Sequence, residues 1–400
     1  MNICLVCNEY PEGPHGGVGT MTQLLAEELV IRKHTVKVVG VYNSDYPSEK
    51  TEIKNGVEII RIKVNLKKRF SVVWGYWKVA RTIKKWIRQS QIDIIEVPDS
   101  YGVFSLFAKF QVPLVLRANG NNTYFSTILH TPLKINTRFY ERNLYKRAFG
   151  FCAVSKYTAD IMKIIYKIRK PVKVIYNAVE THPAAVEQSA PRNRSELAEI
   201  VNPIVFSGTL TPKKGVYQLI SATLALLNKG YEITLILNGK DTINSSTGVS
   251  VKKELLDSIP LPYLKNFRFS GHVTRAQLML QYKYAKAALF PSFAEAFAFA
   301  PMEAMAVGIP VIYSRLCSGE ELISHKEDGL LIDPDSPASI ADAIEFILEN
   351  PEEAGKIGAR GKKKIESNFT KEIMTAKSVE FYEEIINQFN GSDSKSLSNK

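Results

Sequence analysis

The sequence predicts an α/β protein built from two Rossmann-like, doubly wound parallel-sheet domains. With 400 residues, of which 45% are hydrophobic and 23% charged, the chain is long and apolar enough for two hydrophobic cores. Short continuous apolar runs, typical of strands that are covered on both faces, alternate with apolar residues at helical spacing. This pattern begins at the N-terminus and begins again after a break near Pro183. Two successive sheets therefore fit the chain better than one enlarged sheet.

The first half shows the elementary piece of a doubly wound sheet. An apolar strand at 3–7 is followed by a glycine-rich loop that ends in GGVG at 16–19, by leucines at helical spacing, and by a second strand at 36–39. Further apolar runs predict strands at 92–97, 113–116, 150–154 and 172–175.

The second half repeats the pattern after a stretch rich in Pro, Ala and polar residues. There we expect strands at 204–206, 233–237, 287–290 and 310–312, and a helix at 216–228. The expected organisation is an N-terminal domain at 1–182, a linker at 183–203, a C-terminal domain at 204–368, a helix at 369–390 that packs back on the N-terminal domain, and a disordered tail at 391–400.

The net charge of +12 is unevenly distributed along the chain. Residues 1–180 hold 28 basic and 14 acidic residues, whereas residues 181–400 hold 24 basic and 26 acidic residues. This asymmetry indicates an anionic partner for the first half, such as a membrane surface, a phosphorylated substrate or a nucleic acid.

The densest basic region, 61–88, holds ten basic residues, no acidic residue and all three tryptophans, Trp74, Trp77 and Trp86. One hypothesis is that it contacts the headgroup layer of an anionic membrane, which would favour a lipid-linked acceptor. The alternative is a solvated helix face whose tryptophans pack inward. A second basic set at helical spacing consists of Arg138, Arg142, Lys146 and Arg147. No nucleic-acid motif accompanies these residues, so we expect no nucleic-acid partner.

The four cysteines and the N-terminal residues both favour the cytoplasm. Four cysteines cannot form a disulfide framework, and the first residues lack the basic and apolar segments of a signal peptide. The apolar stretch 287–313 contains three prolines and two glutamates, which argue against a membrane span. We therefore expect a cytoplasmic protein, peripheral on the inner face of the plasma membrane if the membrane hypothesis holds.

The stretch 291–308, PSFAEAFAFAPMEAMAVG, is the most specific candidate site. Pro301 suits the first turn of a helix and Gly308 suits its end. A loop that enters a helix N-terminus directs N–H groups and positive dipole to one place, which favours phosphate, and Glu303 would then lie within reach of neighbouring sugar hydroxyls. The alternative is that Glu303 only complements the helix dipole and that Glu295 is a solvated loop residue.

The turn after the strand at 204–206 is a second candidate site. Gly208 permits close backbone approach, and Lys214 would place a cation at a phosphate above the carboxyl end of the sheet. A lysine in a surface turn is usually solvated, so this turn alone is a weak signal.

Taken in order, several stretches resemble glycosyltransferase family 4, which comprises retaining, nucleotide-sugar-dependent enzymes of the GT-B fold. The resemblance covers nearly the whole chain and rests on GGVGT, RKHTVKVV, AVSKYTAD, VIYNAVE, FSGTLTPKKG and the stretch from Glu295 to Glu303, followed by SGEELI and DGLLIDP. It implies two domains that face an interdomain cleft.

The resemblance also implies roles for individual residues. Glu303 is expected to hold the nucleotide ribose, and Glu295 is expected near the transferred sugar. The donor diphosphate is expected at Lys214. The other residues expected to bind the donor are Gly16, Gly17, Gly208, Thr209, Phe299, Ala300, Glu321 and Leu322. Catalytic roles are expected for Glu295, Lys214 and Asn119.

Three positions depart from the family pattern. Thr209 stands where the family usually has Arg, so one of two cations on the diphosphate is missing, and we hypothesise that Arg117 or Lys213 replaces it. Asn119 stands where many members have His, and an asparagine cannot take up a proton. Ala296 and Ala298 stand where glycines often follow the first Glu, which narrows the loop.

The implied activity is transfer of a hexosyl group from a nucleotide-diphosphate sugar, either a UDP- or a GDP-sugar, without a metal. The expected acceptor is a saccharide or a lipid-linked molecule in cell-surface polysaccharide or glycolipid synthesis. The alternatives are a sugar-nucleotide epimerase or phosphorylase on the same fold, and a catalytically weak sugar-nucleotide-binding protein, which Thr209 and Asn119 motivate.

Overall fold

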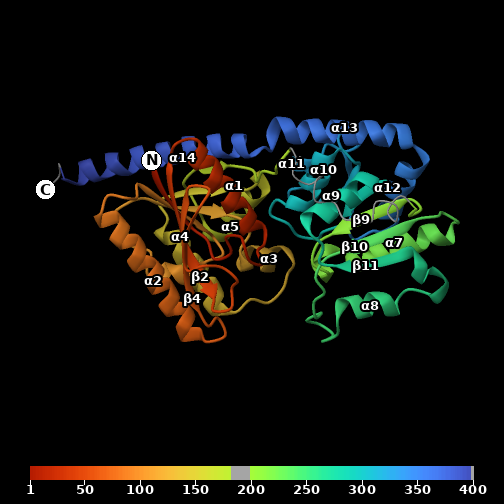
Figure 1. The fold of residues 1–400 in the computed structure, drawn as a ribbon, viewed down its shortest axis with the longest axis horizontal. Helices are drawn as coiled ribbons and strands as arrows, with labels where there is room; N and C mark the ends of the chain where they lie inside the picture. The colour runs from red at the N-terminus through yellow and green to blue at the C-terminus, as the bar shows by residue number, and fades with distance from the viewer. Residues whose placement is uncertain (182–198, 398–400) are drawn as a thin grey trace. The chain divides into compact units, whose positions relative to one another are not determined.

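The computed structural model describes residues 1–181 and 199–397, and its contacts divide the chain into two compact units. Unit 1 comprises Met1–Ala178 and Lys371–Lys400, and unit 2 comprises Val179–Thr370. Figure 1 shows unit 1 in red to yellow with the final blue helix, and unit 2 in green to blue. Most of the linker expected at 183–203 lies outside the described residues.

Unit 1 contains an eight-stranded sheet in the order β3-β4-β2-β1-β5-β6-β7-β8. Its strands are β1 (Asn2–Val6), β2 (Thr35–Asn43), β3 (Thr51–Lys54), β4 (Val57–Val64), β5 (Ile94–Pro98), β6 (Leu114–Ala118), β7 (Gly150–Ala153) and β8 (Val172–Val174). Only the edge strand β3 pairs antiparallel. Strands are added outward from β1 on one side and from β5 on the other, so the order reverses between β1 and β5. This is doubly wound topology.

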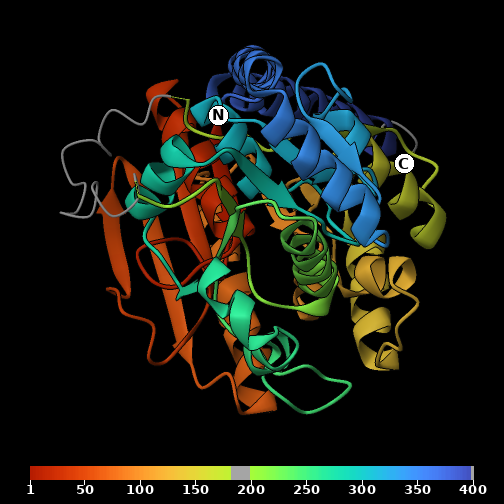
Figure 2. The same cartoon turned by 90° about the vertical axis from the view of Figure 1, so that its right-hand side faces the viewer.

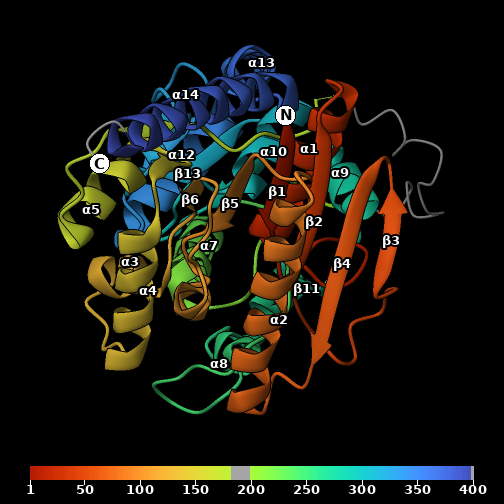
Figure 3. The same ribbon diagram turned by 90° about the vertical axis from the view of Figure 1, so that its left-hand side faces the viewer.

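The helices of unit 1 cover its sheet. They are α1 (Gly17–Ile31), α2 (Arg69–Arg88), η1 (Gly102–Leu106), α3 (Asn122–Ile128), α4 (Ile135–Arg147), α5 (Lys156–Tyr166) and α14 (Lys371–Leu397). Helix α2 packs on β2 and β4, and Figure 3 shows it running alongside these strands. Helix α14 packs against α1.

Helix α14 joins unit 1 through a buried polar network as well as through apolar packing. The Arg117 guanidinium on β6 donates to both carboxylate oxygens of Glu96 on β5 at 2.8 and 3.0 Å and to Ser378 Oγ on α14 at 3.1 Å. Tyr382 Oη on α14 donates to Glu96 Oε2 at 2.7 Å. The helix continues to Leu397, so the tail expected to be disordered from residue 391 is helical up to 397, and only 398–400 lie outside the described residues.

Unit 2 contains six parallel strands in the order β11-β10-β9-β12-β13-β14. They are β9 (Pro203–Ser207), β10 (Thr234–Asn238), β11 (Phe267–Gly271), β12 (Ala287–Phe290), β13 (Val311–Ser314) and β14 (Leu330–Ile332). The order again reverses at one point, between β9 and β12, where Ile204 pairs with Ala287. Both sheets thus have the predicted class.

The helices of unit 2, drawn in green to blue in Figure 2, form two main sets of contacts. Helices α7 (Val216–Asn228) and α12 (Pro337–Glu349) pack together, with α8 (Val251–Asp257) against α7, while α10 (Phe299–Val307) packs against α9 (Arg275–Tyr284) and α13 (Pro351–Asn368). The shorter elements are η2 (Pro212–Lys214), η3 (Leu261–Asn266) and α11 (Gly319–Leu322). None of the helices in the described ranges is both long enough and apolar enough to cross a bilayer.

Candidate functional site

The candidate site of unit 2 lies where the strand order reverses. Strands β9 and β12 are parallel neighbours, so the loops after their carboxyl ends start side by side. In open α/β sheets, ligands bind at this topological switch point because the loops diverge there and leave a crevice.

The turn after β9 packs directly on the loop after β12. Gly215 has φ +69°, a left-handed conformation that favours glycine, and a Cβ there would lie 2.0 Å from the Pro291 carbonyl oxygen. Phe293 N–H donates to the Lys213 carbonyl at 2.8 Å. These two contacts fix Lys213 and Lys214 beside the segment that carries Glu295.

Lys214 and Glu295, both expected in the site, form an ion pair. Burial by itself would raise the pKa of Glu295, but the Lys214 and Lys213 cations and hydrogen bonds from Lys214 and Ser292 hold that pKa below its ordinary value. Glu295 is therefore a carboxylate near neutral pH rather than a solvated loop residue, since 13% of its side chain is exposed.

Lys213 is a second cation at the same place. Burial lowers the pKa of Lys213, the Glu295 carboxylate opposes that shift, and the Lys214 charge adds to it. The two ammonium groups thus lie close enough to one carboxylate for both to interact with it. Sequence reasoning included Lys213 only as a possible substitute cation.

The N-terminus of α10 adds N–H donors. The helix begins at Phe299, its N-cap residue Ala298 provides no side-chain cap, and it ends at Gly308 with φ +93°. The first N–H groups of a helix have no intrahelical partner, and the dipole makes that end positive. Phe299 and Ala300 are therefore placed to present N–H groups to an anion.

Glu303 lies in α10, next to two charged residues that sequence reasoning did not connect with it. Arg275 Nε lies 3.4 Å from Glu303 Oε1, and Arg275 also pairs with Glu180. Burial raises the pKa of Glu303, Arg275 opposes the rise, and Glu180 adds to it. Glu303 has an ionic partner, so it does more than complement the helix dipole. No sequence spacing links residues 180, 275 and 303.

The remaining residues expected in unit 2 differ in exposure. Thr209 is exposed, and Gly208 lies near Lys214, because a Cβ at Gly208 would be 3.8 Å from Lys214 Cε. Glu321 and Leu322 lie on α11 after β13, but the Leu322 side chain is fully buried. Any contact of Leu322 with a ligand must therefore use its backbone.

The glycine loop of unit 1 is held by Glu9, which sequence reasoning missed. Glu9 accepts from Gly16 N–H at 3.2 Å and from Gly19 N–H at 2.9 Å. A Cβ at Gly19 would lie 2.1 Å from the Glu9 carbonyl oxygen, so that position needs glycine. The N–H of Gly16, a residue expected to bind the donor, is therefore satisfied within unit 1, and Gly17 begins α1.

Asn119 follows β6 and is positioned by a buried acid. Its N–H donates to Asp99 Oδ1 at 3.0 Å, and its side-chain amide donates to the Arg117 carbonyl at 3.1 Å. Asp99 also accepts from Tyr145 Oη at 3.2 Å. Glu141 holds the next turn by accepting from the N–H groups of Asn122 and Thr123. Asn119 thus lies on a loop that is fixed from both ends.

The structure overturns the hypothesis that Arg117 replaces the missing cation. Its side chain is 0% exposed and pairs with Glu96 inside unit 1. A guanidinium buried against its own carboxylate is not available to a diphosphate.

The basic and aromatic region 61–88 separates into buried and exposed residues. Arg61 is buried and pairs with Glu52, Lys63 donates to backbone carbonyls, and Trp86 is 5% exposed. Trp74 and Trp77, in contrast, are 47% and 41% exposed. The inward-packed alternative is therefore correct for Trp86 and wrong for Trp74 and Trp77.

Among the residues described, no group of three or more His, Cys, Asp or Glu side chains is arranged to hold a metal ion.

Known proteins match this chain along nearly its whole length. The family model for Glycosyltransferase Family 4 matches residues 15–182, and the model for Glycosyl transferases group 1 matches residues 188–364. An uncharacterized glycosyltransferase from Methanocaldococcus jannaschii is 25% identical over 368 residues, which cover 88% of this chain and 90% of the relative.

Solved structures share the fold. Sucrose-phosphate synthase from Thermosynechococcus elongatus superposes with a TM-score of 0.73 at 19% identity, covering 100% of this chain and 99% of the other. An Anabaena protein in complex with UDP and glucose has a TM-score of 0.71 at 17% identity, with coverage of 100% and 99%.

Two parallel-sheet units with charged residues gathered at a switch point, together with these matches, define an enzyme with the GT-B glycosyltransferase fold. The chain belongs to glycosyltransferase family 4, among the group 1 glycosyl transferases.

Proposed function

We propose that this enzyme is a retaining hexosyltransferase that takes a hexosyl group from a nucleotide-diphosphate sugar. The acceptor in this proposal is a saccharide or a lipid-linked molecule in cell-surface polysaccharide or glycolipid synthesis. The observation that carries the proposal is the pairing of Lys214 with Glu295 at the switch point of unit 2, beside the uncapped N-terminus of α10.

The donor binds unit 2 in this proposal. Glu303 accepts hydrogen bonds from the ribose hydroxyls. The diphosphate lies against Lys214 and the N–H groups of Phe299 and Ala300, because cations and a helix N-terminus favour anions. A UDP-sugar or a GDP-sugar fits this arrangement, and the Anabaena protein of the same fold was solved with UDP and glucose.

Lys213 supplies the second cation in the proposal. Glu295 already neutralises the charge of Lys214, so one lysine alone brings little net positive charge to a diphosphate. Lys213 lies close enough to interact with the same carboxylate. Because these ammonium groups meet the phosphate charge, the proposed chemistry requires no metal.

The transfer step follows from the placement of charge. The bond between the anomeric carbon and the phosphate oxygen breaks, and the nucleoside diphosphate leaves with the electron pair. Lys213, Lys214 and the α10 terminus are fixed in advance where that negative charge grows, which lowers the barrier. Glu295 lies near the sugar that is transferred.

The acceptor hydroxyl attacks from the face that the leaving group vacates, so the configuration at the anomeric carbon is retained. Its proton passes to an oxygen of the departing phosphate, because Asn119 holds a hydroxyl by hydrogen bonding but cannot take up a proton. Exclusion of water from the closed site prevents hydrolysis.

We also propose that unit 1 contacts an anionic membrane surface through the exposed residues of 61–88. Trp74 and Trp77 are exposed beside exposed basic residues, and aromatic rings with cationic neighbours suit the headgroup layer. Neutralising Lys84, Lys85 and Arg88 is expected to release the protein from anionic vesicles at moderate salt. Unchanged sedimentation of that variant with vesicles would contradict the membrane contact.

Thermal shift with UDP-, GDP-, ADP- and dTDP-sugars tests the donor proposal. One nucleotide should raise the melting temperature of the wild type, and Lys214→Ala should abolish the rise. Lys265→Ala is the control, because Lys265 is exposed and lies just before the amino end of β11. The candidate site, in contrast, lies at the carboxyl ends of the strands. The proposal is wrong if no nucleotide sugar stabilises the wild type.

Product analysis separates the proposal from its rivals. Release of nucleoside diphosphate with a new α- or β-linkage of the donor's own configuration supports retaining transfer. Conversion of the nucleotide sugar without release of nucleotide would indicate an epimerase, and dependence on free phosphate would indicate a phosphorylase. Binding without turnover on any acceptor would indicate a nucleotide-sugar-binding protein, the rival that Thr209 and Asn119 favour.

A further inference from the structure

Four exposed basic residues of α2 form a cluster that we call the α2 basic cluster: Arg81, Lys84, Lys85 and Arg88. Residues three and four positions apart share one face of a helix, so the backbone positions of all four lie on one face of α2. Within the described parts of the chain, none of them pairs with a carboxylate. Lys85 and Arg88 lie in the last turn of α2, where the helix dipole favours cations, but like charges at this spacing also destabilise a helix through mutual repulsion. An external anion would offset it.

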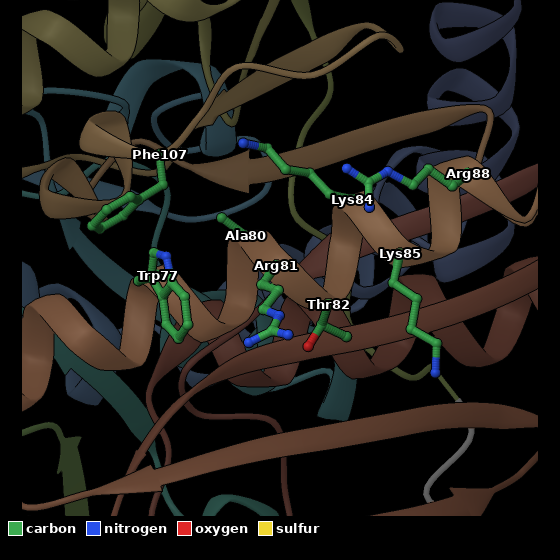
Figure 4. Close-up of a pocket in the computed structure, with 8 residues that line it drawn as sticks. All are labelled: Trp77, Ala80, Arg81, Thr82, Lys84, Lys85, Arg88 and Phe107. Atoms are coloured by element: carbon green, nitrogen blue, oxygen red, sulfur yellow. The ribbon is translucent and has the colours of Figure 1, made fainter.

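The cluster lines a hollow of about 520 Å³ that also includes Trp77, Thr82 and Phe107. In Figure 4, Lys84 and Arg88 extend to one side of α2 and Arg81 and Lys85 extend to the other, while Phe107 lies beside Trp77 at one end. Arg81 also lies over the Trp77 ring, 5.4 Å from its centroid. The lining holds four cations and no carboxylate. Such a site is complementary to a compact group that carries more than one negative charge.

We infer that this hollow binds the terminal phosphate of a membrane lipid, that is, a phosphomonoester or diphosphate headgroup. A terminal phosphate carries about 1.5 to 2 negative charges and three free oxygens near neutral pH, which suits four separate cationic donors. A phosphodiester carries one charge and is flanked by carbon on both sides. Arginine and lysine both form strong charge-assisted hydrogen bonds to phosphate.

The apolar continuation of the same face identifies a lipid, rather than a soluble phosphate, as the occupant. Phe70, Trp74 and Trp77 follow one another at spacings of four and three residues, in line with Arg81. Phe70 is 89% exposed, and Leu66, just before the helix, is 46% exposed. A soluble ligand in the hollow would leave these side chains in water, whereas a bilayer would bury them while its phosphates met the cations. The inference deepens the proposed membrane contact and rests on it.

Vesicle sedimentation tests whether the site binds the terminal phosphate specifically or is attracted only by the negative charge of the membrane surface. One set of phosphatidylcholine vesicles contains phosphatidic acid, and a second contains enough phosphatidylglycerol to give the same zeta potential. At constant salt, a diffuse attraction depends only on the surface potential, so both sets would bind alike. A terminal-phosphate site predicts about five- to tenfold tighter binding to phosphatidic acid, and inorganic pyrophosphate should remove that excess.

Two variants of equal charge decide which residues are responsible. The quadruple variant R81Q/K84Q/K85Q/R88Q should lose the preference for phosphatidic acid. The matched control, R138Q/R142Q/K146Q/R147Q, removes the same charge from exposed positions of α4 in the same unit and should keep the preference, even if its overall binding falls.

Three results would overturn the inference. They are equal binding of the wild type to both vesicle sets, equal loss of preference in the α4 control, and binding of pyrophosphate without any binding to vesicles. Nucleotide binding, measured in parallel, uses residues of unit 2. Loss of nucleotide binding with the lipid preference intact would therefore contradict the proposed transfer reaction and leave this inference standing.

Discussion

At the scale of single residues, the charge around Glu295 is the property that can be tested most directly. Its carboxylate interacts with two lysines. Thr209 follows Gly208, where a Cβ would lie 3.8 Å from Lys214 Cε. The number of cations that would face the proposed donor diphosphate can therefore be changed one at a time at positions 209, 213 and 214.

Lys213→Ala should weaken UDP or GDP binding and lower kcat/KM by about 10- to 100-fold, since a hydrogen bond to a charged group contributes about 1.5–3 kcal/mol. Adding Thr209→Arg to that variant should recover much of the loss by restoring a cation next to Lys214. Calorimetry with the nucleoside diphosphate and with the free nucleoside measures the effect, which should be confined to the diphosphate. If Lys213→Ala binds and turns over like the wild type, Lys213 has no part in diphosphate binding.

Glu303→Ala should weaken binding of the nucleoside itself, because the proposed partner of Glu303 is the ribose. The expected loss is about 10- to 100-fold, again from one or two hydrogen bonds to a charged group. Glu180→Gln is the control, since it removes the other carboxylate that pairs with Arg275 and leaves Glu303 in place. Unchanged affinity of Glu303→Ala by calorimetry would refute the ribose role.

The residue types of the site could be read from the sequence more completely than their partners could. The order of motifs placed Lys214 and Glu295 in one site, and the structure joins them. The contacts of Glu9 with the glycine loop and of Arg275 with Glu303 link segments that no sequence periodicity relates. The role of Arg117 was wrongly predicted, because an arginine at the end of an apolar run gives no sign that it pairs with a buried Glu96 on the neighbouring strand.

At the scale of secondary-structure elements, the loops after β5 and β6 are held by buried acids. Burial raises the pKa of Asp99 to about 7, and the nearby Glu141 carboxylate adds to this rise. The hydrogen bonds that Asp99 accepts from Asn119 N–H and from Tyr145 oppose the rise. A carboxyl group whose pKa is higher in the folded than in the unfolded state favours folding below its unfolded pKa, and that contribution is lost as the pH rises through the folded pKa.

Unit 1 should therefore lose stability between about pH 4 and pH 7, by up to about 1.4 kcal/mol per pH unit, with little further change above. Asp99→Asn should flatten this dependence, because the amide oxygen still accepts from Asn119 N–H and carries no charge. Urea unfolding at pH 5, 6, 7 and 8 measures the effect, with Asp160→Asn as the control because Asp160 is exposed. Parallel pH profiles of the wild type and Asp99→Asn would contradict the assignment.

Most strands with a continuous run of apolar residues were predicted from the sequence, whereas most strands without such a run were missed. The continuous apolar runs correspond to β1, β5, β9 and β12, which are buried between helices. The β3–β4 hairpin was not predicted. Asn55 and Gly56 connect the two strands, and both have positive φ, as the central residues of a tight hairpin turn do. An Asn-Gly pair between two strands is a known sequence signal for such a turn, so this hairpin could have been predicted.

At the scale of the whole molecule, the repeated βα pattern predicted the two hydrophobic cores and their fold class. The packing of the last helix, α14, on unit 1 depends on contacts that this pattern does not contain. Ser378 and Tyr382 on helix α14 form hydrogen bonds with the Arg117–Glu96 pair. Ile385 packs against Gly150 so closely that a Cβ on Gly150 would lie 2.5 Å from the Ile385 side chain. The sequence predicts a helix at 369–390 that packs back on the N-terminal domain, but it cannot specify these partners.

A chain that ends at Thr370 should consequently lose the cooperative folding of unit 1. It would lack the buried residues Met374, Phe381, Tyr382 and Ile385 and would expose the apolar surface of unit 1 that they cover. At about 1.5–3 kcal/mol for each large side chain, this loss approaches the whole stability of a typical domain, about 5–15 kcal/mol. The buried Arg117–Glu96 pair would also lose two hydrogen-bond partners.

Hydrogen exchange should show β5 and β6 losing protection while β9 and β12 keep theirs, because the latter belong to unit 2. A chain that ends at Asn390 keeps all four apolar residues and should match the full-length protein. Full protection of β5 and β6 in the shorter chain would show that unit 1 folds without α14.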